Sequence, residues 1–226
     1  MLGKDLNVAV GVPCTDVWVP KFGLAFAAMC SYFGMKRIAG CATQRLQILS
    51  STGSMLPQLR ENLVLSAMRE GCSHLLMLDS DMKFPRDSIH RLLAHGKDIV
   101  AANCTTKVIP AEPTGVLLGG DRLYTDPEST GLVGGIESIG TAVMMFRLDI
   151  FKKIPRPWFY QEWAPEIQHF VGEDRYFCHK ARACGFEVFV DQDISKLVTH
   201  IGPFEYGHDV VGEIIKEKED AESKAA

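Results

Sequence analysis

Short apolar stretches alternate with segments of helical spacing through the first half of this chain. Each apolar stretch has the length of a buried strand, and each helical segment is bounded by proline, glycine or both. Because parallel strands need a long crossover between them, this alternation predicts an α/β fold with a largely parallel sheet covered by helices on both faces. The strands are expected at residues 6–12, 36–42, 73–78 and 98–103, and the helices between them at 20–34, 56–70 and 85–96.

The second half is less regular and is expected to form a small irregular subregion appended to the first. Residues 110–135 are rich in glycine, proline, aspartate and threonine, which indicates loops. Residues 155–170 carry many aromatic side chains, a composition suited to a loop that orders over a cleft. No linker divides the chain, so a single domain over residues 1–226 is predicted. Its remaining elements are expected as strands at 140–146 and 187–190, helices at 148–153 and 173–184, and a helical tail at 206–226.

Composition excludes several classes of protein. The 226 residues are 46% hydrophobic, enough for a core and a cleft, and a net charge of −4 gives no general attraction to nucleic acid. No stretch reaches the roughly 18 apolar residues of a membrane span. The seven cysteines are scattered and form no C-x-x-C pair, which argues against a disulfide framework or structural zinc site. We therefore expect a cytoplasmic protein without a nucleic-acid partner or a membrane span.

Two carboxylates follow the apolar stretch Leu75-Leu-Met-Leu78, in the sequence Asp79-Ser80-Asp81. Open α/β sheets bind ligands at the carboxyl ends of their strands. Residues i and i+2 of an extended chain point the same way, so Asp79 and Asp81 are expected to converge on Mn²⁺ or Mg²⁺, with a diphosphate completing the coordination. The alternative for such a D-x-D sequence is a solvated turn.

Two further candidates lie in the second half. Gly172-Glu173-Asp174 opens a predicted helix, where a carboxylate is stabilised by the helix dipole and free amides. Capping of the helix N-terminus would explain one acidic residue. Because two acidic residues follow the aromatic loop in succession, one of them is also a candidate general base for an acceptor hydroxyl. His200 follows an apolar stretch and is either a structural histidine or a third metal ligand from another strand end.

In order along the chain, these features resemble the GT-A fold of nucleotide-sugar-dependent glycosyltransferases. The likeness is to small enzymes of bacterial and phage genomes related to the large inverting family. The resemblance covers about residues 6–202 and implies a nucleotide-sugar-binding half at 1–104 and an acceptor and catalytic half at 105–205. It is carried by residues 8–13, 60–71, 74–85, 139–146 and 172–178 and by His200.

The resemblance implies a role for each matching residue. Those near the donor are Pro13 and Thr15 at the nucleobase and ribose, Ser50 or Ser51 at the base, Arg60 at the diphosphate, Asp79 and Ser80 at the ribose or sugar, and Gly140 and Thr141 at the transferred sugar. For Arg60, the alternative to a donor contact is an exposed residue on a helix. For Gly140 and Thr141, the alternative is simply the start of a strand. Met82 stands where the family usually has an acid or proline, and the base loop lacks the usual aromatic or acidic group, which leaves the donor open.

The catalytic roles follow in the same way. Asp174 is implied as the base, with Glu173 beside it for orientation, and Asp81 with His200 and Asp79 as metal ligands. The aromatic loop is expected to cover the acceptor through Trp158 and Trp163.

The function expected is transfer of a sugar, with inversion, from a UDP- or GDP-linked donor to the hydroxyl of a saccharide, lipid-linked or protein acceptor. It would work in a bacterial or phage-infected cytoplasm, and an oligomer is compatible with it. Nucleotidyl transfer to a sugar phosphate is an alternative, although the first strand is not followed by the Gly-rich basic loop of those enzymes. A non-catalytic nucleotide- or glycan-binding module is another, and a retaining mechanism is open because the same fold hosts it.

Overall fold

The computed structural model describes residues 4–15, 17–166, 168–202 and 205–208. Within them, one sheet has the strand order β2-β1-β3-β9-β5-β12-β7, and five of its seven strands run in the same direction while β9 and β7 run against them. Its strands are β1 (Lys4–Cys14), β2 (Cys41–Thr52), β3 (His74–Leu78), β5 (Ile99–Ala101), β7 (Leu132–Val133), β9 (Val143–Arg147) and β12 (Val188–Asp191).

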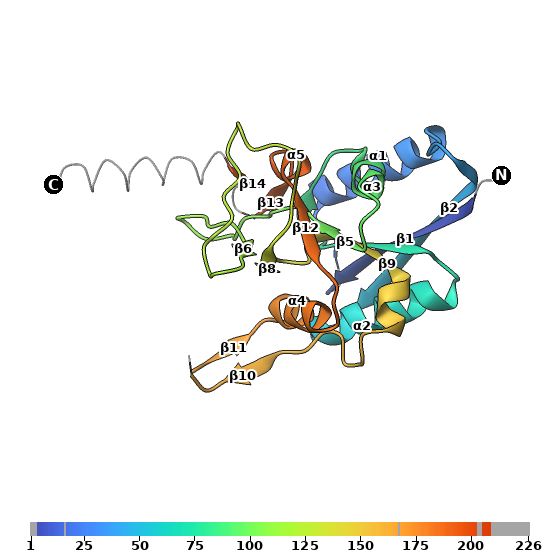
Figure 1. Ribbon diagram of the computed structural model, residues 1–226. Coiled ribbons are helices and arrows are strands. Elements are labelled where there is room, and N and C mark those ends of the chain that lie inside the picture. The colour runs from blue at the N-terminus through green and yellow to red at the C-terminus, as the bar shows by residue number, and fades with distance from the viewer. Residues whose placement is uncertain (1–3, 16, 167, 203–204, 209–226) are drawn as a thin grey trace.

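Helices cover both faces of this sheet (Figure 1). On one face lie α1 (Pro20–Met35), α3 (Ser88–Ala94) and α5 (Gln192–Ser195); on the other lie α2 (Leu56–Arg69), α4 (Glu173–Ala183) and the 3-10 helix η1 (Leu148–Lys152). The predicted fold class, an α/β fold with a mostly parallel sheet flanked by helices, is confirmed.

Local sequence explains where these helices begin and end. Pro20 takes the first position of α1, where its fixed φ suits the helix and its missing N–H costs nothing. After α2 the chain reverses at Gly71, whose φ of 64° is readily adopted only by glycine. Helix α4 has acids in its first turn and Lys180 and Arg182 in its last, the arrangement that the helix dipole favours.

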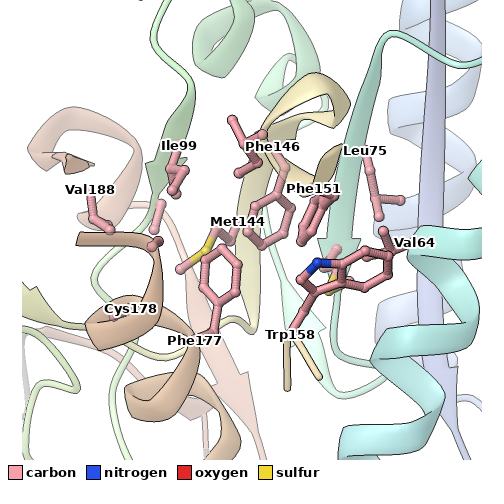
Figure 2. Packing of buried hydrophobic residues seen from close by; sticks show 14 of the residues in the cluster. Val64, Leu75, Ile99, Met144, Phe146, Phe151, Trp158, Phe177, Cys178 and Val188 are labelled. Carbon is pink, nitrogen blue, oxygen red and sulfur yellow. The ribbon is translucent and has the colours of Figure 1, made fainter. Parts of the chain in front are cut away.

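The central strands are buried on both faces, which is why they read as continuous apolar runs. In β3, Leu76 and Leu78 pack toward α1 and α3, whereas Leu75 and Met77 pack toward α2 and α4. Figure 2 shows the second of these two cores, in which Met144 and Phe146 of β9 meet Phe177 of α4.

Two predictions about the sheet were wrong. The second strand is β2, residues 41–52, rather than residues 36–42. It is an edge strand paired only with β1, so its solvent side tolerates polar side chains and its sequence lacks an apolar run. The second half is also not appended to the first, because β9 lies antiparallel between β3 and β5 in the middle of the sheet.

Smaller strands lie outside the main sheet. Three short strands pair in the order β14-β13-β4, from β4 (Met82–Lys83), β13 (Thr199–Ile201) and β14 (Glu205–Tyr206). Strands β6 (Val116–Leu117) and β8 (Ile136–Ser138) form a pair, and β10 (Glu162–Ala164) and β11 (His169–Val171) form a hairpin. The tail predicted at 206–226 lies almost wholly outside the described residues. No helix within the described ranges has the length and apolar character needed to cross a bilayer.

Candidate functional site

Asp79-Ser80-Asp81 lies at the carboxyl end of β3, as predicted, but in a turn. The Met82 amide donates to the Asp79 carbonyl over 3.2 Å, and the Asp79 amide donates to the Ala142 carbonyl of the neighbouring segment over 2.9 Å. The extended geometry assumed for the two carboxylates was therefore wrong. Asp79 contacts Arg60, whereas Asp81 contacts His200 and Lys107, so the two acids have different partners.

Asp81 and His200 meet because two short strands pair. His200 lies opposite Met82 in the β13–β4 ladder, and the Ile201 amide donates to the Asp81 carbonyl over 2.7 Å. This places His200 Nε2 3.3 Å from Asp81 Oδ1, with the Lys107 ammonium on the other carboxylate oxygen. Burial disfavours the charged carboxylate, but hydrogen bonds and charge from His200 and Lys107 lower the pKa of Asp81 to about 2.

A pocket of about 460 Å³ opens above these groups. It brings together four of the residues predicted at the donor, Pro13, Thr15, Asp79 and Ser80, with the predicted metal ligands Asp81 and His200. The rest of its lining is Cys14, Gly53, Ser54, Leu56, Leu59 and Lys107. Ser50 is exposed on the edge strand opposite Val12, and Ser51 lies opposite Pro13; neither lines the pocket. Gly53 and Ser54, in the loop that follows β2, line the pocket instead.

Arg60 is buried beneath this pocket, with 2% of its surface exposed. Its Nη2 donates to Asp79 Oδ2 over 3.3 Å and lies 3.1 Å from Asp79 Oδ1, an oxygen that accepts no hydrogen bond within the described residues. Its Nε donates to Glu173 Oε1 over 3.2 Å. Burial opposes its charge, but the two carboxylates raise its pKa. The alternative of an exposed helix residue is wrong, because the buried guanidinium joins the end of β3 to the start of α4. The contact of Arg60 with a diphosphate stays a prediction.

Asp174 is the second residue of α4 and lines a separate pocket of about 410 Å³. Burial and the neighbouring charge of Glu173 raise its pKa, against the opposing effects of the Arg175 amide and the Arg60 charge. Glu173 itself is buried and paired with Arg60. The arrangement therefore separates the roles of the two acids, since Glu173 anchors the helix start while Asp174 faces a cavity.

Gly172 leaves room for the Asp174 carboxylate. A Cβ at residue 172 would lie 2.8 Å from Asp174 Oδ1, while the φ of −65° and ψ of 156° suit any residue. We expect Gly172→Ala to displace the carboxylate and to reduce turnover about ten- to a hundredfold. Unfolding in urea should show a free energy within about 1 kcal/mol of the wild type, because the entropy that alanine removes from the unfolded chain is offset by the displaced carboxylate and by the poorer N-cap. Gly23→Ala, where a Cβ meets nothing within 4 Å, is the control, and equal turnover in both variants would contradict the prediction.

Gly140 and Thr141 precede β9 beside the second pocket. A Cβ at Gly140 would lie 3.2 Å from the hydroxyl of Thr114, which lines that pocket. Thr141 is buried, and the hydroxyls of both threonines have no hydrogen-bond partner within the described residues. Buried hydroxyls usually find a partner in protein or ordered water, and of these two residues Thr114 lines the second pocket, where a ligand or water would reach it. The role of Gly140 and Thr141 at the sugar stays a prediction.

The predicted acceptor contact of Trp158 is wrong. Its ring is 3% exposed and packs at 5.1 Å from the Phe151 ring in the core, where Figure 2 shows it beside Val64. Glu61 of α2 fixes this segment against the core, because its carboxylate accepts hydrogen bonds from the backbone amides of Trp158 and Phe159. Trp163, by contrast, is 47% exposed on the β10–β11 hairpin and stays a candidate for acceptor binding.

Lys107 is a pocket residue that the sequence analysis missed. It follows β5 by six residues and lines the first pocket beside Asp81. The signal that could have found it is the rule already applied to β3, since β5 is parallel to β3 and also ends at the ligand-binding edge of the sheet.

The site offers a divalent cation two protein ligands. His200 Nδ1 lies 2.8 Å from the Thr105 carbonyl and donates to it, so Nε2 is the ring nitrogen that faces Asp81; a cation bound there would take the place of the proton that Nε2 shares with that carboxylate. Within the described ranges no cluster of three or more histidine, cysteine, aspartate or glutamate residues is arranged as a metal site. Asp81 and His200 thus fit a cation that takes its other ligands from phosphate and water, as Mg²⁺ commonly does.

Comparison with known proteins gives a fold and no family. No protein-family model matches the sequence, and no curated protein does. The structure is similar to that of A197 from STIV, with a TM-score of 0.58 at 16% identity over 90% of this chain and 91% of that one. A second match, to S. aureus TarS 1-349 in complex with UDP-GlcNAc, has a TM-score of 0.45 at 12% identity over 83% of this chain and 56% of the other. The likeness to A197 shows a shared fold.

Proposed function

We propose that this chain is a GT-A-type glycosyltransferase that moves a sugar from a UDP- or GDP-linked donor to an acceptor hydroxyl with inversion, assisted by Mn²⁺ or Mg²⁺. The observation that supports this proposal is that one buried arginine, Arg60, connects the residues of two pockets. Arg60 contacts Asp79, which lines the pocket at the end of β3, and Glu173, which adjoins Asp174 in the second pocket. One pocket suits a charged donor, and the other holds a carboxylate with a raised pKa.

On the donor side, the loops after β1 and β2 would border the nucleoside, and Lys107 would neutralise part of the diphosphate charge. Asp81 and His200 would hold the cation. A cation there would supply charge stabilisation for the leaving diphosphate.

On the acceptor side, Asp174 would accept the proton of the attacking hydroxyl. The hydroxyl oxygen would form its bond to the anomeric carbon while the bond from that carbon to the diphosphate oxygen breaks, and the electron pair would leave with the nucleoside diphosphate. A base on the face opposite the leaving group gives inversion. A raised pKa suits this role, because it brings the proton affinity of the carboxylate closer to working pH.

The test is thermal unfolding of the full chain with UDP, GDP, CMP or dTDP, each with and without Mn²⁺. A nucleotide at one hundred times its Kd stabilises the folded state by about 2.7 kcal/mol. That raises Tm by roughly 5–10 °C for a chain of this size. We expect one nucleoside diphosphate to give this shift with Mn²⁺ and less without it. Asp81→Asn should lose the metal-dependent part, whereas Asp149→Asn on the exposed surface of η1 should keep it.

Turnover then separates the reaction classes. Incubation with UDP- and GDP-sugars, Mn²⁺ and saccharide acceptors should release a nucleoside diphosphate. Release of pyrophosphate from a nucleoside triphosphate and a sugar phosphate would identify a nucleotidyltransferase instead. Nucleotide binding without turnover of any donor would identify a binding module, and the absence of a metal-dependent shift with every nucleotide would count against the proposal.

A further inference from the structure

Three pockets meet on the exposed side of α4. The pocket that contains Asp174 shares Arg175 with a larger pocket of about 750 Å³ under the β10–β11 hairpin. A third pocket, of about 590 Å³, shares Glu137 with the first and His179 with the second. The shared residues place the three pockets next to one another along α4, and we call the three together the α4 groove, which begins at Asp174.

Polar groups occupy the junction of the α4 groove. Arg175 Nη2 lies 3.1 Å from Glu137 Oε1, and His179 Nε2 lies 3.3 Å from the same oxygen. Nearly half of the Arg175 and His179 side chains is exposed. A carboxylate, a guanidinium and an imidazole held against one another can donate to and accept from hydroxyl groups without moving.

Aromatic rings line the part of the α4 groove under the β10–β11 hairpin. Trp163 lines it from the hairpin and packs edge-on against Phe170 at 5.1 Å, which holds the indole in place. Tyr176 lines it from α4 and packs against Tyr160 at 5.7 Å. Figure 1 shows the hairpin extending alongside α4. Exposed aromatic faces beside hydrogen-bonding groups suit ligands with both apolar C–H faces and hydroxyl edges.

The charges of the α4 groove balance. Its lining contains four carboxylates, Glu137, Glu162, Glu166 and Asp174, and four cationic side chains, Arg122, Arg175, Lys180 and Arg182. Such a surface has no net attraction for a polyanion, and its polar groups suit a neutral ligand rich in hydroxyls.

The groove is also long. From Asp174 to Ala183 the helix advances nine residues, or about 14 Å at ~1.5 Å per residue. This exceeds one sugar ring. We propose that the α4 groove binds the acceptor as a neutral oligosaccharide of several units, with the reacting unit at Asp174 and the following units along α4 toward Trp163. The assignment as an acceptor groove rests on the proposed function.

The test is isothermal titration calorimetry of the full chain with linear oligomers of glucose and of N-acetylglucosamine, from monomer to hexamer, and with oligogalacturonate as the anionic probe. We expect affinity for one neutral series to rise with each added unit until the groove is filled. Trp163→Ala should weaken binding of the longest oligomer about tenfold. Tyr124→Ala, at an exposed aromatic residue outside the three pockets, should leave it unchanged.

The inference is overturned if no neutral series shows length-dependent binding, if only oligogalacturonate binds, or if Trp163→Ala and Tyr124→Ala behave alike. The Mn²⁺-dependent increase in Tm that a nucleotide gives the wild-type chain is measured in the same series of experiments. If that shift is present and the groove fails the test, the proposed transferase stands and its acceptor is bound elsewhere. If the groove binds oligomers but no nucleotide shifts Tm, the proposed function fails and the groove is not an acceptor site.

Discussion

Asp174→Asn is expected to lower kcat by roughly 10²–10⁴-fold, the usual contribution of a positioned general base. The amide keeps the shape of the carboxylate but has no proton affinity to offer the acceptor hydroxyl. Binding of the donor nucleotide should be unchanged, because Asp174 lines the second pocket and not the one at the end of β3. The measurement is steady-state release of nucleoside diphosphate, with Asp149→Asn as the matched exposed control.

The same variant predicts two effects of pH. Burial and the charge of Glu173 raise the pKa of Asp174, and a base works ionised, so wild-type kcat/KM should fall as pH drops through a value above the ordinary aspartate pKa. This decrease at low pH should be absent from the residual activity of Asp174→Asn.

A carboxylate whose pKa is raised on folding costs stability when it ionises as pH rises. The Asp174→Asn variant should therefore unfold at the same denaturant concentration as the wild type, or at a higher one, at neutral pH. An unchanged decrease at low pH or an unchanged kcat would exclude Asp174 as the base.

Arg60→Met is expected to reduce the free energy of unfolding by about 3–5 kcal/mol. Methionine fills similar space, but it leaves the Asp79 and Glu173 carboxylates without the guanidinium that both contact. Breaking a buried ion pair by removing one partner is costly because the remaining charge stays out of water. Arg60→Lys should lie between the wild type and Arg60→Met, since a single ammonium cannot reproduce the planar fork that reaches both acids.

The measurement is urea unfolding at neutral pH. Arg69→Met is the control, because Arg69 is exposed in the last turn of the same helix and such surface changes stay within about 0.5 kcal/mol. A loss below about 1 kcal/mol in Arg60→Met would show that the two carboxylates do not depend on the arginine. A variant that keeps its stability but loses nucleotide binding would instead favour the diphosphate contact inferred from the sequence.

Local pattern was enough to predict the layers of the fold. An apolar stretch with the length of β3, followed by acids and flanked by helices of regular spacing, has few ways to bury its side chains other than inside an α/β sheet. The rule for parallel strands placed Asp79, Ser80 and Asp81 at the carboxyl end of β3, and the family resemblance added Pro13 and Thr15; all five line one pocket. Strand β2 was misplaced because an edge strand needs no continuous apolar run.

Other features depend on contacts between segments far apart in the chain. Periodicity marks Trp158 only as an aromatic residue in a proline-rich segment, and the Glu61 carboxylate, 97 positions away, places it in the core. The sequence left Arg60 either facing a diphosphate or exposed on its helix, and its ion pair with Glu173 forms only because α4 packs near α2. The insertion of β9 and the approach of Lys107 to Asp81 are likewise long-range.

The sequence by itself therefore determined the layers and the acids at the carboxyl end of β3, because burial follows from local periodicity. Only the tertiary structure decided which charge each acid contacts and which aromatic ring remains exposed. Those outcomes depend on contacts between separate segments, which are 113 positions apart for Arg60 and Glu173 and 97 for Glu61 and Trp158. No local pattern encodes them.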